Sequence, residues 1–284
     1  MVDKRLYLPK EWTQDKERCE EAGVPEEERS YHSQSELALG LLERAVGLGH
    51  LQAPWVTADD TYGKSPEFRD GVAALGLWYM LEVPSDTPVW PPLTLWFTPE
   101  ALRQRRPPQP RPDPAQRQQV RERAQALPAS AWQAFTVGEG AQGARTYLFA
   151  FERRRESREG EPGTPLGVVY RKNLDGSEAR YYFTNAPFDT PLATQSRVAA
   201  ARWPIETEIE VNKSHLGLDE YEVRGWQGWN HHITVCLLAS AFLLSLQQDW
   251  GEKSAPDYAS ASVSGRLRAF AAQALDDSRL GVVA

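Results

Sequence analysis

The sequence predicts an α/β fold, in which helices flank a sheet. Two short apolar strands are expected in its first third, within "APWVTADD" (Ala53–Asp60) and "LWYMLEVP" (Leu77–Pro84). A helix is expected between them, from Pro66 to Gly76, with Ser65 as its N-cap. A continuous apolar strand such as the second is typical of a sheet covered on both faces, and alternating strands and helices are typical of α/β proteins.

One more strand and one more helix are expected before this region. "RLYLP" (Arg5–Pro9) predicts a short strand, and the polar, acidic residues 10–32 predict a connector. Ser33 or Ser35 is expected to cap a helix that runs to Gly47, because leucines recur there at helical spacing.

The middle of the chain has a different composition. It begins with a proline-rich stretch, including "RQRRPPQPRPDP", that predicts a linker or surface loop. "TYLFAF", "LGVVY" (Leu166–Tyr170) and "RYYFT" (Arg180–Thr184) predict strands, and Asp175-Gly176 predicts a hairpin turn between the last two. We therefore expect a β-rich insertion within the α/β domain. The expected segments are 1–86, 87–190 and 191–284.

Three helices are expected in the last segment. They are Leu192–Ala201, a helix that begins at Pro204, and a buried apolar helix over Ile233–Gln248. The apolar run in the last helix is shorter than the roughly 18 residues of a membrane span, so no membrane is expected as a partner. The N-terminus has no apolar leader, and the two cysteines have no metal-ligand spacing. These features favour a cytoplasmic protein.

Charge is distributed unevenly along the chain. The formal net charge of −7 argues against non-specific binding of nucleic acid by the chain as a whole. Residues 87–185, however, contain 15 Lys/Arg and 10 Asp/Glu, whereas the remainder contains 17 and 29. This asymmetry favours an anionic partner for the insertion.

Two adjacent carboxylates, Asp59 and Asp60, close the first apolar strand. Ligands of open α/β sheets collect at the carboxyl ends of strands, so a carboxylate in this position can serve a functional site. An Asx turn or a helix N-cap explains the same residues without any function.

A second set of charged residues occurs in "RWPIETEIEVNK". Arg202, Glu206, Glu210 and Lys213 are separated by four, four and three residues, which places them on one face of a helix. Trp203, Ile205, Ile209 and Val211 predict that this helix is half-buried. A solvent face of i,i+4 ion pairs is the simpler explanation of such a pattern.

The two sets together predict a metal-dependent nuclease. Carboxylate oxygens of Glu206 and Glu210, facing the acidic strand end at Asp59 and Asp60, suit Mg²⁺ or Mn²⁺ rather than zinc. Two such cations, roughly 3.5–4 Å apart, can activate a nucleophile and stabilise a leaving oxygen. Arg202 and Lys213 would then contact DNA phosphates.

Other chemistries have less support. His215, His231 and His232 lack the spacing of a zinc site. The sequence contains no G-x-S-x-G elbow and no P-loop, which argues against a serine hydrolase or a nucleotide hydrolase. A glycosidase could also use two carboxylates, and the ten tryptophans are compatible with sugar stacking.

These motifs resemble the DDE transposases of bacterial insertion sequences, in the branch with a Y-(2)-R-(3)-E-(6)-K signature. Arg202, Glu206 and Lys213 have the spacing of its last three positions. "VTADDTYG" resembles the strand that carries the family's second catalytic aspartate, which places that residue at Asp59 rather than Asp60. "RLYLPKEW", "AGVP" and "GLDEYEVRGWQGWNHHI" also resemble family segments, so the resemblance covers nearly the whole chain.

The resemblance implies an RNase H-like fold, with a mixed sheet flanked by helices and interrupted by a β-rich insertion. It implies Mg²⁺-dependent (or Mn²⁺-dependent) cleavage and strand transfer, with Asp59 and Glu206 as catalytic metal ligands. The implied partner is DNA that carries transposon terminal repeats, in the nucleoid of a bacterial cytoplasm.

Two departures from the family pattern affect the expected activity. Ala199 stands where the signature has Tyr. The chain also opens at a segment similar to the family's third strand, so the first strands, with the first catalytic aspartate, are expected to be missing. Asp3 corresponds to a non-catalytic position. We therefore expect the C-terminal portion of a transposase, inactive by itself.

Two other interpretations stay open. The chain could be a non-catalytic regulator that binds transposon ends, as a homodimer or together with intact transposase. It could also be the remnant of a decayed transposase gene.

Overall fold

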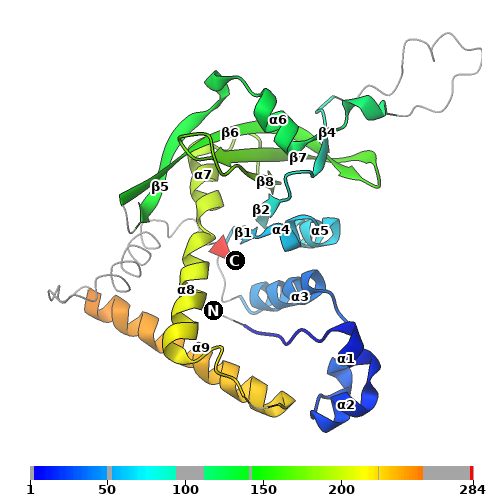
Figure 1. Cartoon of the computed structure of the whole chain (residues 1–284), viewed down its shortest axis with the longest axis vertical. Coiled ribbons are helices and arrows are strands. Elements are labelled where there is room, and N and C mark those ends of the chain that lie inside the picture. The colour runs from blue at the N-terminus through cyan, green and yellow to red at the C-terminus, as the bar shows by residue number, and fades with distance from the viewer. Residues whose placement is uncertain are drawn as a thin grey trace, which may run out of the picture. The chain divides into compact units, whose positions relative to one another are not determined.

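The computed structural model describes residues 3–49, 53–93, 112–140, 143–222, 224–251 and 282–283 (Figure 1). Most of the proline-rich stretch, residues 94–111, lies outside these ranges. The chain divides into two compact units, one formed by Met1–Gln52 with Trp203–Gly281 and one by Ala53–Arg202 with Val282–Ala284. The sheet belongs to the second unit, and the three-part division into 1–86, 87–190 and 191–284 stays a prediction.

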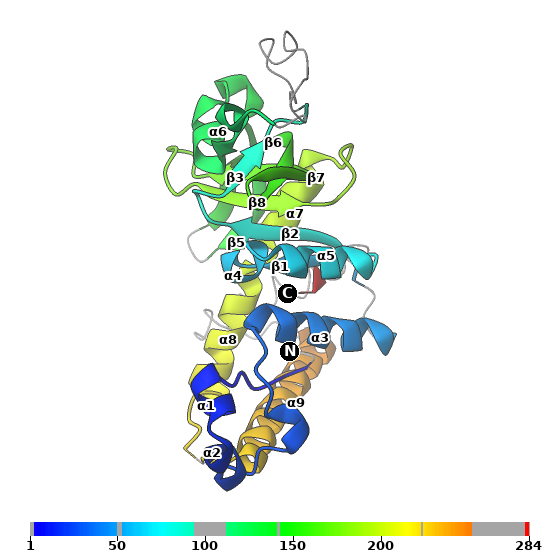
Figure 2. The same cartoon turned by 90° about the vertical axis from the view of Figure 1, so that its right-hand side faces the viewer.

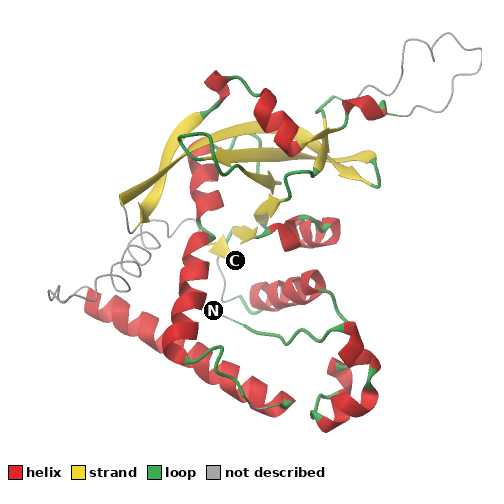
Figure 3. Ribbon diagram, viewed as in Figure 1, coloured by secondary structure: helices red, strands yellow, loops and turns green. Residues whose placement is uncertain are grey.

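The described strands form one mixed sheet of nine strands, in the order β4-β3-β6-β7-β8-β2-β1-β9, with β5 paired to β6 (Figure 3). The pairs β1–β2 and β1–β9 are parallel, and the other pairs are antiparallel. The strands are β1 (Trp55–Ala58), β2 (Trp78–Val83), β3 (Pro88–Trp90), β4 (Gln118–Gln119), β5 (Gln133–Gly140), β6 (Gly143–Arg158), β7 (Glu161–Lys172), β8 (Arg180–Thr184) and β9 (Val282–Val283).

Helices pack on both sides of this sheet, and the fold is the expected α/β, RNase H-like arrangement of a mixed sheet flanked by helices (Figures 1 and 2). The helices in the described ranges are α1 (Lys10–Gln14), α2 (Lys16–Glu21), α3 (Gln34–Gly47), α4 (Asp60–Gly63), α5 (Pro66–Ala74), α6 (Val120–Ala126), α7 (Leu192–Ala200), α8 (Trp203–Leu216) and α9 (Trp226–Gly251).

The predicted hairpin is confirmed. Strands β7 and β8 pair antiparallel from Gly167↔Thr184 to Arg171↔Arg180. Gly176 has φ of +86°, a value that glycine adopts without the steric cost of a Cβ atom. The turn residues of the sequence therefore set the register of this hairpin.

The β-rich insertion continues the same sheet instead of forming a separate layer. Strand β8 pairs with β2 through Met80↔Thr184 and Val83↔Tyr181. The side chains of β6 alternate between the two sheet faces, as in any strand. Glu152 contacts Arg123 of α6, whereas Arg153 packs on Phe188, just before α7. Helices α6 and α7 therefore cover opposite faces.

The predicted helix caps are confirmed. Ser33 accepts a hydrogen bond from the backbone of Glu36, which reaches back to the Ser33 N–H, so α3 begins with a capping box. Ser65 accepts from the backbone of Phe68, with Pro66 in the first turn of α5. Helix α7 begins at Leu192, as predicted.

Two predictions for the N-terminal region are wrong. Arg5–Pro9 is not a strand, and residues 10–32 contain α1, α2 and a 3₁₀ turn. The apolar residues of this stretch pack on α2 and the loop after it, around buried Cys19 and Val24. Burial of side chains in a small cluster, without strand pairing, therefore explains the apolar pattern at Leu8.

The prediction of a buried C-terminal apolar helix is also wrong. Helix α9 begins at Trp226, earlier than expected, and Val235, Leu238 and Phe242 are 50, 66 and 62% exposed. Residues Trp226–Leu246 are long and apolar enough to cross a membrane by length and composition, and 11% of the apolar window is buried. The hydrophobicity of this segment therefore does not reflect burial within the described chain.

We expect Gly63→Ala to destabilise the second unit by about 2–3 kcal/mol. A Cβ atom at Gly63 would lie 1.8 Å from the backbone oxygen of Glu82, so α4 or β2 would have to shift. Urea unfolding measures the change.

The matched control is Gly40→Ala in α3, where a Cβ atom meets nothing within 4 Å. Because alanine is more favourable than glycine in a helix interior, this change should raise the free energy of unfolding by about 0.5–1 kcal/mol. Equal unfolding free energies for both variants would contradict the close approach of α4 to β2.

Candidate active site

Asp59 lies where β1 ends and α4 begins. It is half-buried, and its Oδ1 accepts a hydrogen bond of 2.9 Å from the backbone N–H of Thr61, which makes it the N-cap of α4. The alternative reading of Asp59 as a cap is therefore correct. A carboxylate offers about four lone-pair sites, so capping leaves acceptor capacity for a cation.

The short helix that Asp59 caps is held closely against the sheet. Gly63 at its C-terminal end contacts the backbone of Glu82 in β2. Tyr62 packs on Phe68 of α5, with ring centroids 5.4 Å apart. Burial, and secondarily the negative charge of Asp59, raises the pKa of Tyr62. Tyr62 therefore stays a neutral phenol beside the carboxylate.

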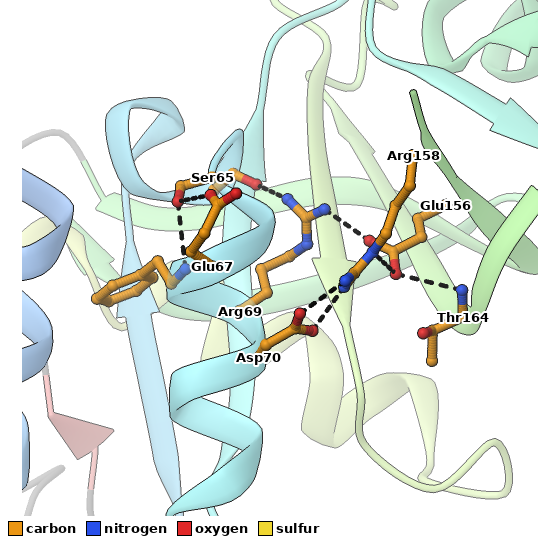
Figure 4. Close-up of polar contacts among 9 residues, drawn as sticks. Ser65, Glu67, Arg69, Asp70, Glu156, Arg158 and Thr164 are labelled. Carbon is orange, nitrogen blue, oxygen red and sulfur yellow. Dashed lines mark hydrogen bonds and ion pairs between the residues drawn. The ribbon is translucent and has the colours of Figure 1, made fainter. Parts of the chain in front are cut away.

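A buried ion pair connects α4 and α5 to the insertion (Figure 4). The Arg69 guanidinium donates to the carbonyl oxygen of Gly63 at 2.5 Å and to Glu156 of β6 at 2.7 Å. Both side chains are almost fully buried, at 5 and 2% exposure. Arg69 thus joins the end of the Asp59 helix to Glu156, which follows Arg69 by 87 positions in the sequence.

The network continues from Glu156 toward solvent. Glu156 also accepts from Arg158 at 2.7 Å and from the backbone of Thr164, and Arg158 forms two hydrogen bonds with Asp70 (Figure 4). Burial alone would raise the pKa of Glu156, but the hydrogen bonds and charges of Arg69 and Arg158 outweigh it and lower that pKa. Glu156 is therefore ionised at neutral pH.

The second predicted carboxylate, Glu206, lies in the first turn of α8 and is exposed. Glu210 and Lys213 are also exposed on α8, as the helical spacing predicts. The expectation of a half-buried helix is correct in part, because Val211 is partly buried but Ile209 is 36% exposed.

Arg202 does not belong to the helical face that its spacing predicts. It lies in the turn between α7 and α8, and its guanidinium is 3.7 Å from the carboxylate of Glu82. Glu82 also binds Arg180 at 2.9 Å. The helix starts one residue later than the charge pattern implies, because Trp203-Pro204 supplies its first turn.

The predicted site residues fall into two groups. Asp59, Asp60 and Arg202 belong to the unit that contains the sheet, and Glu206, Glu210 and Lys213 to the other. Within residues 3–49, 53–93, 112–140, 143–222, 224–251 and 282–283, no three His, Cys, Asp or Glu side chains gather closely enough to hold a metal ion. By donor type alone, the oxygens of Asp59 and Glu206 fit Mg²⁺.

Sequence reasoning missed Arg69, Glu156, Arg158 and Asp70. Arg69 occurs in a helix with buried Phe68 and Val72 on the same side, where a pattern argument expects an apolar residue. No local motif links it to Glu156. Only pairing of β6 into the sheet brings the two charges together.

We expect Glu156→Gln to lower the free energy of unfolding by about 3 kcal/mol, because it leaves the Arg69 charge buried without a countercharge. The lowered pKa of Glu156 means that its contribution is present above about pH 4.5 and is lost as pH falls through the folded-state value. Urea unfolding between pH 3 and 7 should therefore show a weaker acid dependence in the variant.

Asp70→Asn is the matched control. Asp70 belongs to the same network but is 56% exposed, so its loss should cost about 0–1 kcal/mol. A cost for Glu156→Gln no larger than that of the control would show that the buried pair is not what joins α5 to β6.

The sequence model of one family matches this chain. It is described as DDE superfamily endonuclease and matches residues 1–144, slightly more than half of the 284 residues. The match includes Asp59 and the strands β1 and β2, and it ends before α8. A search of curated proteins finds no match. The mixed sheet with flanking helices agrees with such a nuclease, and the chain belongs to the DDE superfamily endonucleases.

Proposed function

We propose that the chain acts in DNA transposition, on the ends of an insertion sequence. The observation that carries the proposal is Asp59, held at the carboxyl end of β1 in a chain of the DDE endonuclease family. Family membership implies a divalent metal and DNA as the substrate. The spacing of Arg202, Glu206 and Lys213 supports the insertion-sequence branch in particular.

In this proposal Asp59 and Glu206 hold Mg²⁺ or Mn²⁺, with Asp60 and Glu210 as accessory carboxylates. The metal supplies Lewis-acid activation of the scissile phosphate and of the attacking oxygen. Lys213 and Arg202 contact the DNA backbone, and the salt bridge of Arg202 with Glu82 holds that guanidinium near the sheet. The resemblance assigns no residue of this chain to the first catalytic aspartate, so we propose that the chain does not cleave DNA by itself.

The second candidate function is a regulator that binds transposon ends without cutting them. The observation that favours it is the basic character of the insertion, whose strands belong to the same sheet as β1, the strand that precedes Asp59. Such a protein would compete with intact transposase for the ends or associate with it.

We expect Asp59→Asn and Glu206→Gln each to weaken Mn²⁺ binding at least tenfold, because each removes one charged oxygen ligand. Isothermal titration calorimetry with Mn²⁺, in the presence of terminal-repeat DNA, measures this affinity. Asp86→Asn and Glu222→Gln, which alter exposed carboxylates elsewhere, should leave the affinity unchanged.

The same samples test cleavage. With Mg²⁺ and labelled DNA that carries the terminal repeats of the element, we expect binding and no strand cleavage. Nicking that requires Mg²⁺ and disappears in Glu206→Gln would overturn the proposal of an inactive chain. Metal affinity that is unaffected by Asp59→Asn and Glu206→Gln, together with DNA binding in EDTA, would favour the regulator.

We also propose a homodimer, in which a second copy covers the apolar stripe of α9. Val235, Leu238 and Phe242 are exposed and follow one another at spacings of three and four, as in a coiled-coil seam. Residues 226–248 contain no Asp, Glu, Lys or Arg, so two copies of the stripe do not repel each other.

Leu238→Lys should convert the dimer to a monomer, because it introduces like charges into the seam. Light scattering coupled to size-exclusion chromatography measures the mass, and Thr234→Lys, beside the stripe, is the control. A wild-type chain that is monomeric at micromolar concentration would contradict the homodimer.

A further inference from the structure

Three arginines from three neighbouring strands lie on one face of the insertion. Arg171 of β7 is the register partner of Arg180 in β8 and of Phe149 in β6. Arg145 precedes Phe149 by four positions, so the alternation of β6 places it on the same face. We call Arg145, Arg171 and Arg180 the arginine row.

Aromatic side chains hold the row in place. The guanidinium of Arg171 lies 4.5 Å from the ring centroid of Tyr147, a cation–π contact. Tyr147 also forms a hydrogen bond with Arg145. Burial lowers the pKa of Arg145, and the neighbouring positive charge of Arg171 lowers it further. Tyr147 therefore interacts with both arginines, through its ring with Arg171 and through its hydroxyl group with Arg145.

A carboxylate of the neighbouring strand β2 links the row to Arg202. Burial raises the pKa of Tyr182 to about 12, and the positive charges of Arg171, Arg180 and Arg202 act in the opposite direction. Glu82 of β2 pairs with Arg180 at 2.9 Å and with Arg202 at 3.7 Å, so it connects the row to Arg202.

The arrangement has an electrostatic cost in the isolated chain. Like charges directly opposite in a sheet are destabilising, and Arg171 faces Arg180 in register. Glu82 offsets part of that repulsion. The guanidinium groups remain accessible: the Arg180 side chain is 53% exposed, and Arg145 and Arg171 are half-buried. An anion that spans the row would offset the rest.

The dimensions favour an extended polyanion. Neighbouring strands are roughly 4.8 Å apart and residues along a strand about 3.4 Å apart, so the backbone positions of Arg180 and Arg145, two strands and four residues apart, are separated by about 17 Å. Duplex DNA presents one phosphate charge per ~1.7 Å of axis, and arginine binds phosphate oxygens with two parallel hydrogen bonds. Arg202 at the end of the row would continue the same track toward the predicted catalytic residues.

We propose that the arginine row is a binding track for the phosphate backbone of duplex DNA. It rests on the proposed function, and it assigns DNA binding to specific residues of the insertion. Because the contacts are to phosphates, the row binds all sequences alike and positions the DNA, whereas choice of sequence comes from elsewhere.

The test is fluorescence anisotropy with a labelled 30-base-pair duplex in EDTA, over a series of KCl concentrations. We expect the double variant Arg171→Ala/Arg180→Ala to bind about tenfold to hundredfold more weakly near 0.1 M salt. The slope of log affinity against log salt should decrease by about 2, because each lost phosphate contact contributes about 0.9. Arg171→Lys should retain the slope, since it keeps the charge.

The matched control is Lys172→Ala. Lys172 is the next residue of β7, and its ammonium group lies on the opposite face, 3.8 Å from the Trp132 ring centroid. Circular dichroism checks that each variant is folded. The proposal would be overturned if the double variant bound DNA as tightly as the wild-type chain, or if Lys172→Ala weakened DNA binding as much as the double variant does.

The remaining outcomes separate this proposal from the proposed function. Binding that depends on the row without an effect of Asp59→Asn on metal affinity would support the row and contradict the nuclease site. Tighter binding of duplex RNA than of duplex DNA would overturn the assignment to DNA. A wild-type chain that binds neither duplex at 50 mM salt would overturn both proposals.

Discussion

The buried pair of Arg69 and Glu156 is the interaction on which the geometry of the sheet-containing unit around Asp59 depends. It lies between helices α4 and α5 and strand β6, where Arg69 donates to the Gly63 carbonyl oxygen and to Glu156. Removal of the Glu156 charge would leave the Arg69 guanidinium buried without a countercharge, whereas Glu156 would keep its contact with Arg158 if Arg69 were removed. The insertion and the Asp59 helix are therefore linked by a buried electrostatic contact.

This coupling gives the insertion a structural role besides any contact with DNA. Strands β6, β7 and β8 extend the sheet from β2, and Gly63 places α4 directly on β2. Asp59 is the N-cap of α4, so its orientation depends on the sheet, on Gly63 and on Arg69 together. A carboxylate fixed in this way keeps its orientation at low entropic cost, which suits a metal ligand.

The acidic and the basic side chains of the proposed sites lie at different strands of the same sheet. Asp59 follows β1, whereas the arginine row crosses β6, β7 and β8, with Glu82 and Arg202 between them. We expect metal cations near Asp59 and DNA phosphates along the arginine row. Helix α8 adds exposed carboxylates a few residues after Arg202, and helix α9 adds an exposed apolar stripe.

Local patterns in the sequence determined the caps at Ser33 and Ser65, the β7–β8 turn at Gly176 and the strand that ends at Asp59, because each depends on residues a few positions apart. Tertiary structure decided what depends on distant residues. Arg5–Pro9 does not form a strand, and much of the apolar surface of α9 is exposed. Arg202 pairs with Glu82 and lies before α8, not on it. Tertiary structure also joined Arg69 to Glu156, since hydrophobic periodicity carries no information about which buried charges meet across a sheet.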